Sequence, residues 1–508
     1  ALRYYPFGFQ PGGEFGFLSW IMVYLYKFLH LFDSSVTLQY AAVIYPAVAF
    51  LFIGIFFFLT VKELFNDEKI ALLATAFIAV IPVFIQRTLS GVSDKEALGT
   101  ALMMMALYFF VKAWKEEKDV RKGLVFALLA GLASGAMGLA WGGIALLLLI
   151  IGLFVLVDLC LDKFKPAMLY YYLLWFVPMF IILLLFSRYS IVAFLYHPFN
   201  IVFPPLGVAL LYFLINKYNP FKIKQKLENK FPLGLFSLIV FLIFIFIFLL
   251  VVMGPVFIKQ TIITIFTYLI RPFGGSRWGL TVAEGQQPYV QEWMGSFSLF
   301  YFWLFFLATI LLFYEMVKNV KKYKWLLTGA YVLFIFAFIF SRYSASSALN
   351  GTNPLSLYLF FGSAMLFVIF LAAFYFYSFV KDKVTHEQLT QINVYFLFVL
   401  IWFIVMAVSA RSAVRLIYIF APITAVLVAY IFMYVYYFVK QQVVSNYLKV
   451  FCYVILFFLA LSPFGAAIQK FPLLGDLPVF NSDGVLAAFA KSSYSMTRSS
   501  GTIYNAQW

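Results

Sequence analysis

Two carboxylates, Asp94 and Glu96, stand two residues apart between two apolar runs of the kind that cross a bilayer. Charged side chains are costly at a membrane, so a pair retained there usually handles an ion, a proton or a substrate. Carboxylate oxygens are the ligands that Mg²⁺ and Mn²⁺ prefer. The alternative is a helix N-terminus, where the helix dipole favours Asp and Glu. The pair by itself leaves both interpretations open.

A third carboxylate, Glu284, lies in the distant segment 281–288, which follows a turn-rich stretch from Arg271 to Trp278. The glycines and serine of that stretch predict a mobile loop, of the sort that closes over a substrate. An ordinary surface loop is the alternative.

Arginines form the other candidate group. Arg415 follows Arg411 by four residues, which predicts one face of a helix entering the membrane. Guanidinium groups at that depth suit a lipid phosphate, although helix-end anchors that reach for water would have the same pattern. Arg87, just before the acidic pair, is a further candidate for the same pocket.

Composition sets the class of protein that must position these groups. The chain has 508 residues, of which 65% are hydrophobic and 11% charged. This balance predicts an all-α polytopic membrane protein. The two cysteines lie in apolar runs and give neither a disulfide framework nor a zinc site. No P-loop or dinucleotide fingerprint is present.

Apolar runs of membrane length predict about 14 spans. They lie near residues 36–61, 70–86, 97–111, 123–140, 143–160, 168–186, 199–216, 234–254, 297–317, 325–341, 355–380, 392–409, 413–438 and 450–464.

The gaps between these runs differ in charge. Alternate gaps collect most of the lysines, which marks the cytoplasmic side. Nine of the ten arginines lie on the other side, together with Asp94, Glu96 and Glu284, which favours an anionic ligand there. The net charge of +16 is therefore interpreted as a signal for orientation in the membrane and as attraction to the lipid bilayer. No nucleic acid is expected as a partner. The spans hold almost no carboxylates, which argues against a coupled transporter.

Several motifs in this order resemble the catalytic subunit of oligosaccharyltransferase, the membrane enzyme of protein N-glycosylation, in its archaeal form. The resemblance covers nearly the whole chain and implies a GT-C-type transmembrane domain. The motifs are Tyr4-Tyr5-Pro6-Phe7-Gly8 with Gly12-Gly13, Lys62-Glu63-Leu64, Ser93-Asp94-Lys95-Glu96, Trp141-Gly142-Gly143, Thr281-Val282-Ala283-Glu284 with Gln287-Pro288, and Val414-Arg415-Leu416 through Pro422.

The resemblance implies a metal-dependent, inverting glycosyltransferase of the cell membrane, with its active site on the extracytoplasmic face. A divalent cation, Mn²⁺ or Mg²⁺, would be held by Asp94, Glu96 and Glu284, with Asp94 and Glu284 as catalytic residues. The donor would be a dolichol-linked (pyro)phosphate oligosaccharide, and the acceptor the Asn of an N-X-S/T sequon in a polypeptide.

The same resemblance implies a substrate-binding group. Arg415, with Arg411 and Arg87, would bind the donor phosphate, and Glu284 would contact the acceptor amide. Trp508 would begin the acceptor-reading W-W-D-x-G motif. The first acidic motif of the family would lie before Ala1, so a fragment lacking the first span and the C-terminal soluble domain is expected.

The domain organisation follows from these assignments. Residues 1–35 are expected to end the first external loop, 36–465 to form the transmembrane domain, and 466–508 to start an external C-terminal region. Within the domain, 255–296 is the expected mobile loop. The two runs within 325–380 exceed the family pattern and predict an inserted hairpin, which makes Arg342 a rival for the role of Arg415.

Two alternatives remain open. Another polyprenyl-phosphate-dependent GT-C glycosyltransferase, such as a protein O-mannosyltransferase, would place its acidic pair in the first external loop and lack the motif around Glu284. A lipid flippase or transporter is a remote alternative, which intramembrane carboxylates would have favoured.

Overall fold

The computed structural model describes residues 16–186, 189–191, 194, 199–227, 230–270, 283–442 and 445–470. Within these ranges the regular elements are helices. One isolated β-bridge pairs Arg342 with Asn350. The helices are α1 (Phe17–His30), α2 (Leu38–Phe65), α3 (Glu68–Ile78), α4 (Pro82–Ile85), α5 (Lys95–Lys115), α6 (Val120–Ala140), α7 (Ile144–Cys160), α8 (Pro166–Leu184), η3 (Phe199–Val202), α9 (Phe203–Tyr218), η4 (Pro220–Lys222), α10 (Ile223–Leu227), α11 (Leu233–Ile270), η5 (Ala283–Gly285), α13 (Val290–Phe297), α14 (Leu299–Val317), α15 (Lys324–Phe340), α16 (Pro354–Leu357), η6 (Tyr358–Gly362), α17 (Ser363–Lys381), α18 (Lys383–Thr390), α19 (Val394–Ser412), η7 (Val414–Leu416), α20 (Ile417–Gln442) and α21 (Asn446–Lys470).

Length and composition make this a multi-pass membrane protein. In the described part of the chain, 10 helices are long and apolar enough to cross a membrane, and α7, α15 and α21 are shorter apolar helices. These elements coincide with every predicted span except the one near 70–86. The all-α polytopic fold class is therefore confirmed.

The span predicted near 70–86 is broken. Helix α3 ends at Ile78, and α4 starts only at Pro82. A proline disfavours helical geometry in the residue before it, and Ile81 is extended, with ψ 114°. The chain therefore turns after α3, and the short α4 leads directly to Arg87.

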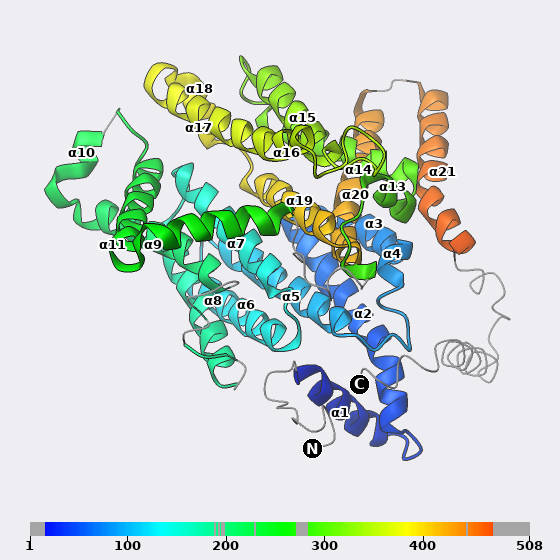
Figure 1. Ribbon diagram of the computed structural model, residues 1–508. Coiled ribbons are helices and arrows are strands. Elements are labelled where there is room, and N and C mark those ends of the chain that lie inside the picture. Colours follow the sequence, from blue (N-terminus) through cyan, green and yellow to red (C-terminus); the bar gives the residue numbers. More distant parts are fainter. Residues whose placement is uncertain are drawn as a thin grey trace.

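Helix α20 lies at the centre of the fold, packed against α3, α14 and α19, and its residues from Ile417 to Tyr430 are buried. Helices α2, α5, α6 and α8 pack side by side as a second group (Figure 1). Gly131 on α6 permits the close approach to α8, since a Cβ there would stand 2.4 Å from the Trp175 carbonyl oxygen.

The long loop expected from residue 255 starts later, because helix α11 extends into it. The helix continues through a kink at Gly254, which has φ +80° and precedes Pro255, and it ends at Ile270. Residues 255–270 are helical because Pro255 suits a helix start and the following sequence is mostly apolar. The exposed apolar side chains of α11 suit contact with lipid.

Two other regions bear on the predicted organisation. Residues 325–380 form α15 and the α16–α17 segment, which pack on each other beside α14. The N-terminal segment contains α1, which packs on α2. The motif at Tyr4–Gly13, the stretch 271–282 and Trp508 lie outside the described residues.

Candidate active site

The segment before Asp94 is fixed to α2 through a proline. Pro46 has no N–H, so the Ala42 carbonyl lacks its usual helical donor. The Ser93 hydroxyl donates to that carbonyl instead. The Gly91 amide donates to the Val43 carbonyl at 2.9 Å. Gly91 has φ +91°, which glycine adopts at no steric cost. Together these contacts set where helix α5 begins.

Asp94 is the N-cap of α5. Its Oδ1 accepts from the Lys95 amide at 2.8 Å. The Tyr45 hydroxyl donates to the Asp94 carbonyl at 2.6 Å and accepts from the Leu98 amide at 3.0 Å. The second carboxylate oxygen, Oδ2, lies 3.6 Å from Nη1 of Arg87. Capping therefore uses Oδ1 and leaves Oδ2 facing the Arg87 guanidinium.

The charge state of Asp94 follows from its neighbours. Burial raises the pKa of its carboxyl, but a hydrogen bond with Glu96, the bond from the Lys95 amide and the charges of Lys95 and Arg87 outweigh burial. The net result is a pKa below the ordinary value for Asp. Asp94 is therefore ionised at neutral pH and can bind a cation.

Glu96 lies in the first turn of α5 and is buried, with 6% of its surface exposed. Its Oε2 atom has no hydrogen-bond partner among the described residues. A buried carboxylate oxygen without a donor is costly, so this atom calls for a cation or a proton. Below it, the Thr100 hydroxyl donates to the Glu96 carbonyl at 2.8 Å and lies 3.4 Å from the Tyr418 hydroxyl of α20.

Arg87 joins the acidic pair to Glu284. Its Nη2 lies 2.8 Å from Oε1 of Glu284, while Nη1 faces Asp94. The side chain of Arg87 is 20% exposed, and those of Asp94 and Glu284 are 39% and 56% exposed. The structure thus brings two carboxylates from distant segments to one guanidinium at a solvent-accessible position.

The segment that carries Arg415 lies beside Glu284. The Val414 amide donates to the Gln286 carbonyl at 2.9 Å, and η7 contacts η5. Arg415 is exposed. The segment of Arg415 is therefore next to the group formed by Arg87, Asp94 and Glu284.

The prediction that Arg411 and Arg415 share one helix face is wrong. Helix α19 ends at Ser412, and Ala413 is extended, with φ −157° and ψ 142°. Arg411 is buried, and its Nη1 donates to the Ser341 hydroxyl at 2.8 Å. The break separates the two arginines into different surroundings.

Arg342, the rival for the role of Arg415, uses three of its five N–H donors within the fold. It donates to the carbonyls of Gln287, Pro288 and Asn350 at 3.2, 3.1 and 3.1 Å. Its guanidinium also covers the Tyr289 ring at 4.3 Å. These contacts anchor the segment that follows Glu284.

The three candidate ligands can be tested against the needs of a metal ion. Within the described ranges, no three His, Cys, Asp or Glu side chains converge closely enough to hold one. The Arg87 guanidinium lies between Asp94 and Glu284, where a shared metal ion would have to bind. The donor chemistry nevertheless fits a hard divalent ion, since all three groups are carboxylates and Oε2 of Glu96 lacks a partner.

Sequence reasoning assigned no role to Tyr45, Tyr418 or the Trp141 ring, which shape the floor of the site. Trp141 lies against α5, since a Cβ on Gly99 would stand 2.7 Å from its ring. The rings of Trp141 and Tyr418 are 6.1 Å apart. The Trp141-Gly142-Gly143 motif was visible in the sequence, whereas the two tyrosines carry no local signal.

Comparison with known proteins finds similarity to the family that the motifs resemble. Residues 1–228 match the family model of oligosaccharyl transferase STT3, N-terminal. A dolichyl-phosphooligosaccharide-protein glycotransferase of Methanococcus voltae is 28% identical over 143 residues, covering 28% of this chain and 15% of the relative. The STT3 subunit of the Saccharomyces cerevisiae dolichyl-diphosphooligosaccharide–protein glycosyltransferase is 30% identical over 115 residues, covering 23% and 15%.

Solved structures extend the likeness to the fold. The archaeal oligosaccharyltransferase AglB from Archaeoglobus fulgidus, in complex with an inhibitory peptide and a dolichol-phosphate, has a TM-score of 0.58 at 17% identity, covering 92% of this chain and 48% of that one. The apo form has a TM-score of 0.59, covering 89% and 47%. The chain thus spans about half the length of these structures. By sequence, the N-terminal region is thus similar to the STT3 family of oligosaccharyl transferases, and the fold is like that of the archaeal structures over most of the chain.

Proposed function

We propose that this protein transfers an oligosaccharide from a dolichol-linked (pyro)phosphate donor to the Asn of N-X-S/T sequons, on the extracytoplasmic face of the membrane. The observation that carries the proposal is the meeting of Asp94 and Glu284 at Arg87, beside the segment of Arg415. The archaeal relative supports it, having been solved with a dolichol-phosphate and with a tethered acceptor peptide containing an NVT sequon.

Sidedness rests on charge. Lysines gather in alternate gaps between spans, which marks the cytoplasmic side. The gap that contains Asp94 belongs to the other set, because α3 and α4 lead the chain from the Glu63 end of α2 back to its Ala42 end. A donor carried by the membrane suits a site that cytoplasmic nucleotide sugars do not reach.

Asp94, Glu96 and Glu284 would hold the divalent cation, Mn²⁺ or Mg²⁺. Bound there, the cation would offset negative charge on the departing phosphate. Arg87 would orient the two accessible carboxylates, which it already contacts.

The remaining roles belong to substrate groups and their protein partners. Glu284 would accept a hydrogen bond from the acceptor carboxamide, which places the amide nitrogen for attack. That nitrogen forms a bond to the anomeric carbon while the bond from that carbon to the phosphate oxygen breaks, with inversion. The proton that the amide loses would pass to the carboxylate of Glu284, and the phosphate leaves with the electron pair. Arg415 would bind the phosphate through its forked donors.

The test uses membranes that contain the full-length protein, a polyprenyl-linked oligosaccharide and two peptides that differ only at one residue. We expect glycan transfer to the Asn-X-Thr peptide and none to the Gln-X-Thr peptide, measured by mass spectrometry. Transfer to the hydroxyl of Ser or Thr in either peptide, or no transfer with any polyprenyl-linked donor, would contradict the proposal.

A further inference from the structure

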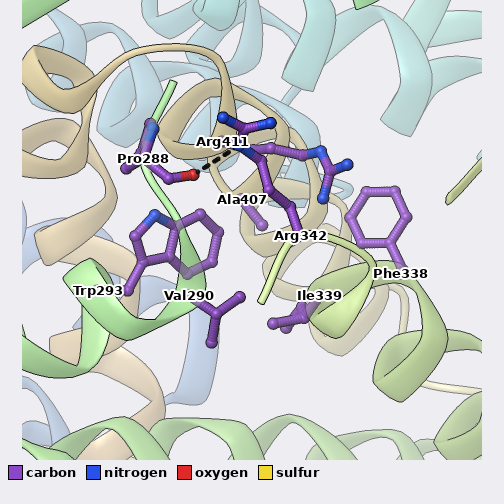
Figure 2. Close-up of a pocket in the computed structure, with 8 residues that line it drawn as sticks. All are labelled: Pro288, Val290, Trp293, Phe338, Ile339, Arg342, Ala407 and Arg411. Carbon is purple, nitrogen blue, oxygen red and sulfur yellow. Dashed lines mark hydrogen bonds between the residues drawn. The ribbon is translucent and has the colours of Figure 1, made fainter. Parts of the chain in front are cut away.

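A cluster of two arginines lies between α13, α15 and α19, next to the segment that follows Glu284. Arg342 and Arg411 line one pocket that is partly open to solvent (Figure 2). The other lining residues have apolar side chains, apart from an indole N–H: Pro288, Val290, Trp293, Phe338, Ile339 and Ala407. Two cations therefore face a cavity whose remaining walls are almost wholly apolar.

Arg411 has few protein partners for a buried charge. It is 8% exposed, and its contacts are the Ser341 hydroxyl at 2.8 Å and the face of the Phe360 ring at 4.2 Å. A guanidinium has five N–H donors, so most of them are left for another acceptor. In the parts of the chain that the structure describes, the carboxylates in ion pairs are matched to lysines and to Arg87, and none to Arg342 or Arg411. Buried cations without a counter-ion are unfavourable.

Trp293 supplies a further donor. It is 3% exposed, and its indole N–H has no hydrogen-bond partner among the described residues. The Pro288 carbonyl, an acceptor at the edge of the pocket, already accepts from Nε of Arg342 at 3.1 Å. The side chains around the pocket therefore offer donors and positive charge, which is the chemistry of an anion site.

We propose that this pocket binds a phosphate group, with Arg411 as its main charge partner and Arg342 and Trp293 as additional donors. The inference is independent of the proposed transfer reaction, in which Arg411 has no part. The phosphate is either inorganic phosphate or the headgroup of a lipid, because both present the same oxygens to a guanidinium. Since Arg342 also holds the carbonyls of Gln287 and Pro288, a bound phosphate stabilises the segment that follows Glu284.

The experiment measures thermal unfolding of the full-length protein in phosphatidylcholine nanodiscs at constant ionic strength. One arm replaces gluconate with inorganic phosphate. The other arm contains no inorganic phosphate and replaces part of the phosphatidylcholine, a zwitterionic phosphodiester, with phosphatidic acid, an anionic phosphomonoester. We expect a saturable rise in Tm of a few degrees in at least one arm, because a ligand that binds only the folded state stabilises it. The arm that responds identifies the source of the phosphate.

Variants separate binding from general charge. Arg411→Gln is expected to abolish the saturable rise, and Trp293→Phe to weaken the apparent affinity several-fold. Arg121→Gln removes an exposed arginine elsewhere and should keep the full rise. Arg411→Lys, which keeps the charge but loses the fork, should weaken binding and provides the test if Arg411→Gln does not fold. Two results would overturn the proposal. One is the absence of a saturable rise in Tm in both arms with the wild type. The other is a half-saturating ligand concentration in the Arg411 variants that equals the wild-type value.

Discussion

The two ends of helix α5 each carry a cluster of carboxylates and cations, and the clusters are built differently. At the C-terminal end, Glu63 pairs with Lys112 at 2.5 Å and Lys115 at 3.4 Å. Lys115 also donates to the Glu63 carbonyl and to Asn66. Glu63 is 18% exposed, so one shielded carboxylate is shared by two lysines. Such a cluster is electrically satisfied and serves the fold.

At the N-terminal end of α5 the balance is reversed. Asp94 and Glu284 share one cation, Arg87, and Glu96 lies two residues after Asp94. Glu284 is 56% exposed, and Oε2 of Glu96 has no partner. An accessible cluster in which two carboxylates share one cation and a third has an unpartnered oxygen is the kind that binds a cation or a substrate. The same helix thus ends in a structural cluster on one side and a candidate reactive one on the other.

The largest expected effect comes from removing charge at the N-terminal cluster without removing the cap. In Asp94→Asn, the amide oxygen can still cap α5, because Asn is as good an N-cap as Asp. We expect glycan transfer to fall by about 10² or more, as when one electrostatic contact is removed from an active site. The Tm should stay near the wild-type value. A parallel fall in Tm and transfer would show that Asp94 acts only as a cap.

Arg87→Gln sharpens the comparison by removing the guanidinium that contacts both Asp94 and Glu284. Orienting contacts of this kind typically contribute about 10–100-fold to activity or metal affinity. We expect a loss in that range in a transfer assay, with the same donor and peptide. Full activity would mean that the ion pairs of Arg87 have no part in placing the two carboxylates.

Glu63→Gln is the matching change at the other end of α5. It leaves Lys112 and Lys115 without their carboxylate, which should lower stability by about 1–3 kcal/mol. Transfer per folded molecule should be unchanged. Thermal unfolding and the transfer assay, run on one preparation, check both statements. A selective loss of transfer would break the distinction between the two clusters.

Tyr45→Phe is expected to have the smallest effect. It removes the hydroxyl that bonds the Asp94 carbonyl and the Leu98 amide. The net cost should be about 1 kcal/mol of stability, with transfer reduced only a few-fold. Thermal unfolding measures the first effect and steady-state kinetics the second. A larger loss of transfer than in Arg87→Gln would mean that Tyr45 contacts the substrate.

Much of the fold followed from the sequence because span length and apolar composition are local properties. The exception near 70–86 turned on Pro82, whose effect on Ile81 breaks an otherwise apolar run. The start of the long loop was misplaced at Pro255 because a proline can begin a helix as well as end one.

The site was harder to predict because its geometry depends on tertiary contacts. The pairing of Arg87 with Glu284 joins segments with no local relation in sequence. The separation of Arg411 from Arg415 arises at Ala413, a residue with no intrinsic preference for a break. Likewise, only packing shows that Arg342 is committed to three carbonyls.

Metal dependence tests the central claim, that the N-terminal cluster of α5 is a cation-binding active site. Transfer to a sequon peptide would be measured after chelation and during titration with Mn²⁺ or Mg²⁺, for the wild type, Asp94→Asn and Glu63→Gln. The account predicts loss of transfer on chelation, equal recovery midpoints for the wild type and Glu63→Gln, and a midpoint at least about tenfold higher for Asp94→Asn. Transfer that is indifferent to chelation, or a shifted midpoint in Glu63→Gln instead of Asp94→Asn, would contradict it.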